Sequence, residues 1–146
     1  MSREIRTILL AEDSAADAEM AIDALREAKL ANPIVHVEDG VETLDYLLYR
    51  NAFSGRSKGN PAVVLLDIKM PRLDGLEVLK TMRDTEHLKR VPVVILSSSR
   101  EESDLVHSWN LGVNAYVVKP VDVSQFFSAV QMLGQFWAVL NEFPQE

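Results

Sequence analysis

Cysteine is absent from the 146-residue chain, which excludes a disulfide framework, a thiol nucleophile and a thiolate zinc site. Long hydrophobic runs are absent too. The first apolar run, Ile8–Ala11, is much shorter than a signal-peptide core, and no run approaches the roughly 20 apolar residues of a membrane-spanning helix. We therefore expect a soluble, cytoplasmic protein with no membrane partner.

Positive charge is also scarce, because 15 lysines and arginines face 22 acids and give a formal net charge of −7. No basic cluster stands out, so binding to nucleic acid is disfavoured, since affinity for phosphate backbones needs concentrated positive charge. The apolar content of 47% is enough for a sizeable core in a chain of this length. We expect one domain that spans residues 1–146.

Short apolar runs alternate along the chain with longer helical patterns, which is typical of a parallel sheet with helices on both faces. The predicted strands are residues 7–11, 34–37, 62–66, 91–96 and 115–118. Helix starts are predicted at Ser14 with Asp17 and at Asp74 with Glu77, which have the types and positions of N-cap residues, and at Ser99 with Glu102, which form a capping box. Asp39-Gly40 leads into a further helix. Residues 50–61 are predicted to form a connecting loop, longer than the roughly 2–6 residues usual in α/β folds.

Acidic residues follow two of the predicted strands. Asp67 comes directly after a continuously apolar run, and Glu12 and Asp13 follow the first strand. A buried carboxylate must be hydrated, paired, metal-bound or reactive. In doubly wound sheets ligands bind at the carboxyl ends of the strands, where Ser97 and Lys119 also fall. This set suits a hard divalent cation beside a phosphoryl group, with Asp67 as the nucleophile that forms an acyl phosphate.

With these residues the chain resembles the receiver domains of two-component response regulators. The matching segments are Glu12-Asp13, Asp67 within residues 66–75, Ser97 after residues 93–96, and Lys119-Pro120 after residues 116–118. Four motifs in the right order span nearly the whole chain. The resemblance implies an α/β, flavodoxin-like (βα)5 fold, a doubly wound five-stranded parallel sheet of order 2-1-3-4-5.

The resemblance also implies roles for the acidic residues. Asp67 is expected to accept a phosphoryl group from a sensor histidine kinase. Asp13 and Asp67 would ligate Mg²⁺ (or Mn²⁺) directly, together with the backbone carbonyl of Lys69, and Glu12 would act through water. Such a protein is a phosphoacceptor rather than an enzyme, with autophosphorylation from small phosphodonors and autodephosphorylation expected.

By the same resemblance, Ser97 and Tyr116 form the switch pair and Lys119 contacts the phosphoryl group. No output domain follows the receiver pattern, so the signal is expected to leave through protein–protein contact. The long loop and the extended C-terminus resemble the stand-alone regulators that serve phytochrome-type photoreceptor kinases. A phosphorelay intermediate, or a partner-binding receiver with little phosphorylation-dependent switching, is the alternative.

The last predicted helix covers residues 122–143 or so, and its apolar residues occupy more of the circumference than packing on a sheet requires. Large aromatic side chains in such a position usually mark an interface. We therefore expect a homodimer formed through this helix. The predicted interface residues are Phe136, Trp137, Val139, Leu140 and Phe143.

Two other classes of protein use similar sites. A phosphohydrolase of the haloacid dehalogenase type needs a second acid two residues after its nucleophile, where this chain has Lys69. A flavin-binding flavodoxin needs a hydroxyl- and glycine-rich loop after the first strand, where residues 12–16 here are Glu-Asp-Ser-Ala-Ala. The three histidines, His36, His87 and His107, show no metal-ligand spacing and are expected to be structural or surface residues.

Overall fold

The computed structural model describes residues 6–28 and 30–132, which form a five-stranded parallel sheet of order β2-β1-β3-β4-β5. The strands are β1 (Ile8–Ala11), β2 (Ile34–Val37), β3 (Val63–Asp67), β4 (Val93–Ser97) and β5 (Ala115–Val118). The helices are α1 (Ala15–Glu27), α2 (Gly40–Leu47), the 3-10 turn η1 (Asn51–Phe53), α3 (Gly75–Asp84), α4 (Arg100–Ser108) and α5 (Val123–Met132). This is the flavodoxin-like receiver fold that the sequence predicts.

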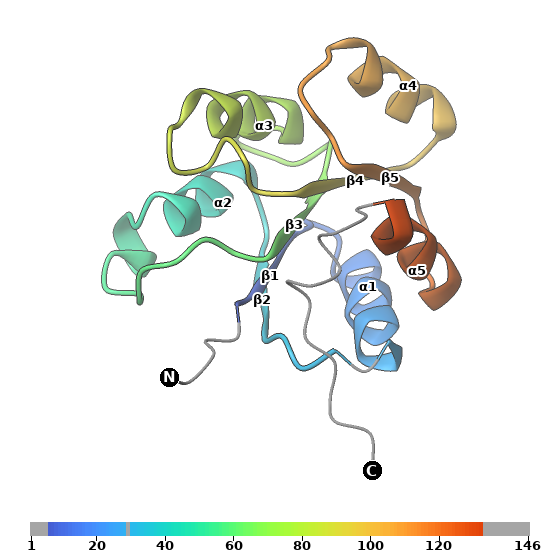
Figure 1. Ribbon diagram of the computed structural model, residues 1–146, viewed down its shortest axis with the longest axis horizontal. Coiled ribbons are helices and arrows are strands. Elements are labelled where there is room, and N and C mark those ends of the chain that lie inside the picture. Colours follow the sequence, from blue (N-terminus) through green and yellow to red (C-terminus); the bar gives the residue numbers. More distant parts are fainter. Residues whose placement is uncertain (1–5, 29, 133–146) are drawn as a thin grey trace.

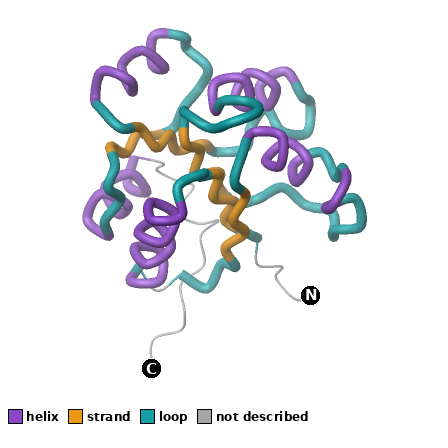
Figure 2. The backbone as a smooth tube through the Cα atoms, turned by 180° about the vertical axis from the view of Figure 1, so that it is seen from behind, coloured by secondary structure: helices purple, strands orange, loops and turns teal. Residues whose placement is uncertain are grey.

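Helices cover both faces of the sheet. In Figure 1, α2, α3 and α4 lie on one side of the strands, and α1 and α5 lie on the other. Figure 2 shows the same layers from behind. Successive strand residues point to opposite faces, so Ile8 and Leu10 enter a core with α1 and α5, whereas Leu9 and Ala11 enter a core with α2, α3 and α4. Two apolar cores therefore fix the sheet from both sides.

The start of β1 and both ends of β3 and β4 differ by one or two residues from the predicted ranges. Strand β4 begins at Val93, because Pro92 before it has no N–H to donate to the ladder. Both strands also extend one residue further than predicted and include Asp67 and Ser97. The two candidate site residues are thus part of the sheet itself, and the N–H of Ile68 still donates to the carbonyl of Leu96 at 3.2 Å.

Four side chains at helix starts accept a hydrogen bond from the backbone N–H three residues later, which confirms the three predicted caps and adds Asp39. These caps are Ser14, Asp39, Asp74 and Ser99. The predicted capping box differs in one respect, since the Glu102 carboxylate accepts from the N–H of Ser98, at 3.1 Å, rather than from that of the cap. Glu102 Oε2 also lies 3.2 Å from Ser98 Oγ and 3.2 Å from Lys69 Nζ.

Arginines hold the amino-terminal side of the sheet. Arg83 donates to four backbone carbonyls over distances of 2.7–3.2 Å, those of Lys89, Val91, Leu111 and Gly112. In the long loop, the Arg56 guanidinium lies 4.0 Å from the ring centroids of both Tyr46 and Tyr49. The loop of residues 50–61 is therefore fastened to α2 by a cation between two aromatic rings.

The predicted dimer helix is described only in its first part, to Met132. Phe136, Trp137, Val139, Leu140 and Phe143 lie outside the described residues, so the interface stays a prediction. Within the described part of the chain, no helix has both the length and the apolar character needed to cross a membrane.

Candidate functional site

The parallel register brings the candidate site residues to one edge of the sheet. Ala11 pairs with Leu66, so Glu12 emerges beside Asp67. The backbone N–H of Lys119, which follows β5, donates to the carbonyl of Ser97 at 2.8 Å. This edge is also the switch point between β1 and β3, where doubly wound sheets bind ligands.

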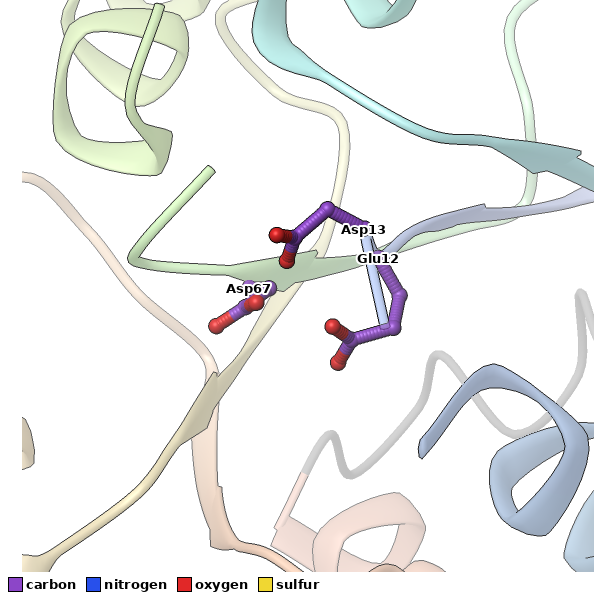
Figure 3. Close-up of side chains that lie close together, drawn as sticks. All are labelled: Glu12, Asp13 and Asp67. Carbon is purple, nitrogen blue, oxygen red and sulfur yellow. The ribbon is translucent and has the colours of Figure 1, made fainter. Parts of the chain in front are cut away.

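Three carboxylates form a cluster at this edge. Glu12, Asp13 and Asp67 each offer an oxygen within 4.8 Å of the other two, and Figure 3 shows the three side chains around one small space at the ends of adjacent strands. Glu12 and Asp67 are buried, whereas Asp13 is exposed. Because like charges at this distance repel and burial strengthens the repulsion, the cluster favours a bound cation or a proton on one of its carboxylates.

Lys119 supplies one positive charge to the cluster. Its Nζ lies 2.8 Å from Glu12 Oε1, 3.2 Å from Asp67 Oδ2 and 3.2 Å from Asp17 Oδ2. Asp17 was predicted only as a residue at the start of a helix, not as a site residue. Its position in the first turn of α1, the helix that directly follows Glu12 and Asp13, could have indicated it. One ammonium therefore serves three carboxylates.

Burial and charge raise the pKa of Asp67 to about 7, first through desolvation and then through the neighbouring Glu12, while Lys119 acts in the opposite direction. Desolvation lowers the pKa of Lys119, but its hydrogen bond to Glu12 and the charge of Asp67 outweigh this effect and raise the pKa above its usual value. The lysine thus stays protonated, and Asp67 lies close to its titration midpoint at neutral pH.

The donor set fits a divalent cation. Mg²⁺ and Mn²⁺ prefer carboxylate oxygens, and the carboxylate cluster has the dimensions of a single coordination sphere. Glu12 already has partners for both oxygens, because Oε2 accepts from the N–H of Ser14 at 3.1 Å and Oε1 faces Lys119. Asp67 is held in the same way, because Oδ1 accepts from the N–H of Lys69 at 3.3 Å and Oδ2 faces Lys119, so Asp13 is the most accessible of the three carboxylates. A role for the Lys69 carbonyl stays a prediction.

The two predicted switch residues both contact α4. Ser97 is fully buried, and its Oγ lies 3.1 Å from the carbonyl of Ser99 and 2.5 Å from Ser103 Oγ. The Tyr116 hydroxyl lies 3.4 Å from His107 Nδ1, and the two rings meet edge to face with centroids 5.8 Å apart. Because Ser103 and His107 are four residues apart, they share one face of α4.

The other two histidines make backbone contacts, as expected for structural residues. The His36 ring pairs with the carbonyl of Glu12 at 2.8 Å, and the His87 ring pairs with that of Leu47 at 3.2 Å.

The segment between Asp67 and α3 forms a loop whose two ends are in backbone contact. The N–H of Gly75 donates to the carbonyl of Ile68 at 2.7 Å, and a Cβ at Gly75 would lie 2.2 Å from the Asp67 carbonyl oxygen. Only glycine allows so close an approach. Helix α3 therefore begins in direct contact with the backbone of Asp67.

Residues 8–131 match the family model of the response regulator receiver domain. Among curated proteins, response regulator Rcp1 of Synechocystis sp. is 33% identical over 132 residues, 90% of this chain and 88% of Rcp1. A structure of the Mn²⁺-bound form of Rcp1 superposes with a TM-score of 0.73, at 31% identity over 96% of this chain and 99% of Rcp1.

Two further solved structures are similar along most of their length. The bacteriophytochrome response regulator RtBRR has 52% identity and a TM-score of 0.91, over 97% of this chain and 85% of RtBRR. The phosphorylated cyanobacterial phytochrome response regulator RcpA has 37% identity and a TM-score of 0.74, over 92% of this chain and 95% of RcpA.

Proposed function

The chain belongs to the response regulator receiver family, and from this premise we propose that it accepts a phosphoryl group on Asp67 from a sensor histidine kinase and passes the signal on by protein–protein contact. The observation that carries the proposal is the position of Asp67, the last residue of a buried strand, within reach of both Lys119 and two further carboxylates. A carboxylate held there is positioned for a charged reaction partner.

In the proposed reaction, an Asp67 oxygen forms a bond to phosphorus while the bond from phosphorus to the donor breaks. The donor is a histidine nitrogen of the kinase or the acetate oxygen of acetyl phosphate, and it leaves with the electron pair. Lys119, protonated and 3.2 Å from Asp67 Oδ2, offsets negative charge on the phosphoryl oxygens. Ser97, at the end of the adjacent strand, is the proposed hydrogen-bond donor to another oxygen.

Asp13 and Asp67 are the proposed direct ligands of Mg²⁺ or Mn²⁺, with Glu12 acting through water. A cation bound there would keep Asp67 ionised and oppose the charge of the phosphoryl group. The Mn²⁺-bound form of the relative Rcp1 supports this assignment.

The proposed partner is a phytochrome-type kinase. Support comes from RtBRR and RcpA, which are described as bacteriophytochrome and phytochrome response regulators. In this proposal the protein stores a signal and does not turn over a substrate. Homodimerisation through Phe136, Trp137, Val139, Leu140 and Phe143 is a further part of the proposal.

Incubation with Mg²⁺ and acetyl phosphate tests phosphorylation directly. Intact-mass measurement should find one added phosphoryl group, stable in acid and labile in base, in the wild type and in the control Asp84→Asn, which changes an exposed aspartate at the end of α3. Asp67→Asn should show no addition. A wild type without the adduct, or an adduct that persists in Asp67→Asn, would overturn the proposal.

A further inference from the structure

A buried pair of hydroxyls joins the end of β4 to the first turn of α4. Ser97 is fully buried and Ser103 is 7% exposed, and their Oγ atoms are 2.5 Å apart. We assign the Ser97 proton to the carbonyl of Ser99, 3.1 Å away, because the opposite arrangement would need the longer contact of 3.4 Å from Ser103 Oγ to the same carbonyl. Ser103 is then the donor to Ser97.

The helix itself does not need the Ser103 hydroxyl. Ser99 is the N-cap, and the backbone N–H of Ser103 already donates to the carbonyl of Ser99 at 3.2 Å. A serine inside a helix commonly bonds its hydroxyl to the carbonyl four residues earlier, but here that distance is 3.4 Å, much longer than the contact with Ser97. Ser103 therefore directs its hydroxyl toward the sheet.

We propose that Ser103 is a positioning residue that holds the Ser97 hydroxyl toward α4 and away from Asp67 until a phosphoryl group arrives. The proposal rests on the proposed function, because it concerns the phosphoryl response of the same site. When Ser97 turns to donate to the phosphoryl group, Ser103 loses its acceptor and has only the distant carbonyl of Ser99 in its place. Part of the free energy that the phosphoryl contacts provide is then offset by the loss of the hydrogen bond between Ser97 and Ser103, which joins β4 to α4.

The consequence is a site that is easier to switch when Ser103 is absent. Ser103→Ala removes the donor that stabilises the unphosphorylated arrangement, and the net contribution of one such hydrogen bond corresponds to roughly a two- to tenfold change in an equilibrium constant. The variant should therefore bind beryllofluoride, a stable phosphoryl mimic, more tightly by about this factor.

Calorimetric titration of the full chain with beryllofluoride in Mg²⁺ measures this effect. The matched control is Ser108→Ala on the same helix, where the hydroxyl donates only to the local carbonyl of Leu105 among the described residues, and its affinity should equal that of the wild type. In a Ser97→Ala background, adding Ser103→Ala should change nothing, because the hydroxyl that it positions is gone.

An unchanged or weaker affinity in Ser103→Ala overturns this inference alone, as does an equal gain in the Ser97→Ala background, which would make Ser103 a packing residue of α4. A wild type that does not bind beryllofluoride overturns the proposed function, and this inference with it. The two failures are therefore distinguishable.

Discussion

The amino-terminal and carboxyl-terminal ends of the strands differ in the partners that their cationic side chains bind. At the amino-terminal side, Arg83 donates to four neutral carbonyls, so its partners are dipoles that cannot change charge. At the carboxyl edge, Lys119 faces Glu12, Asp17 and Asp67, which are charges with a preference for a cation. A charge saturated by carbonyls has a structural role, whereas an excess of carboxylates over cations creates a site ready for a metal ion.

The largest expected effect is a loss of stability on removing Arg83 from the amino-terminal side of the sheet. Arg83→Ala leaves the four carbonyls without their charged donor, and we expect the free energy of unfolding to fall by about 3 kcal/mol, because hydrogen bonds to charged groups contribute more than neutral ones. Urea unfolding measures the loss, and phosphorylation by acetyl phosphate should be retained at temperatures where the variant is folded.

The exposed neighbour Arg90 provides the control, since Arg90→Ala should change the unfolding free energy by less than about 0.5 kcal/mol. If Arg83→Ala abolished phosphorylation of a folded protein, the division between a structural edge and a functional edge would be wrong.

The second expected effect is a gain in stability, on replacing Asp67. The raised pKa of Asp67, about 7, means that the folded state holds a proton that the unfolded chain releases near pH 4. Stability from this group is therefore present at low pH and is lost as pH rises to about 7. In EDTA at pH 8, Asp67→Asn should be more stable than the wild type by about 2 kcal/mol, with a flatter dependence on pH.

Chemical unfolding at pH 4, 6 and 8 checks this dependence. Added Mg²⁺ should stabilise the wild type and reduce its difference in unfolding free energy from Asp67→Asn, because the cation relieves the repulsion among the carboxylates. Equal pH profiles for the two proteins would show that Asp67 is not strained by its neighbours.

The smallest expected effect is that of Asp17, which was not predicted as a site residue, on the affinity for Mg²⁺. In Asp17→Asn the site loses a negative charge, and Lys119 is left to bind Glu12 and Asp67 more fully. Both changes weaken the binding of a divalent cation. Calorimetry should therefore find an affinity for Mg²⁺ lower by about threefold, as expected for a partly exposed ion pair. Asp23→Asn, an exposed aspartate on the same helix, should leave the affinity unchanged, and a tighter site in Asp17→Asn would contradict the argument.

Local patterns predicted the features that depend on short separations. The helix caps connect residues three apart in the chain, and the apolar runs determine which strand residues can be buried. Asp67, Glu12 and Lys119 could be placed at one edge because parallel strands all end there. The ranges of β3 and β4 were slightly wrong, since hydrophobicity does not mark the last polar residue of a ladder.

Side-chain direction was beyond such patterns. Lys119 and Asp17 are separated by 102 positions, and their contact depends on the sheet register and on where α1 starts. Ser97 was predicted as a switch residue, but nothing in a run of serines indicates that Ser103 is its partner. Glu102 likewise contacts both Ser98 and Lys69, a residue from another loop, which local patterns do not indicate.

The glycine at the start of α3 has a mechanical consequence. With the backbone of Gly75 packed against the Asp67 carbonyl, there is little room for α3 to shift relative to the end of β3. On the other side, the β4–α4 segment is held by hydroxyls and a carboxylate, which can exchange partners one at a time. We therefore expect a change at Asp67 to displace α4 more readily than α3.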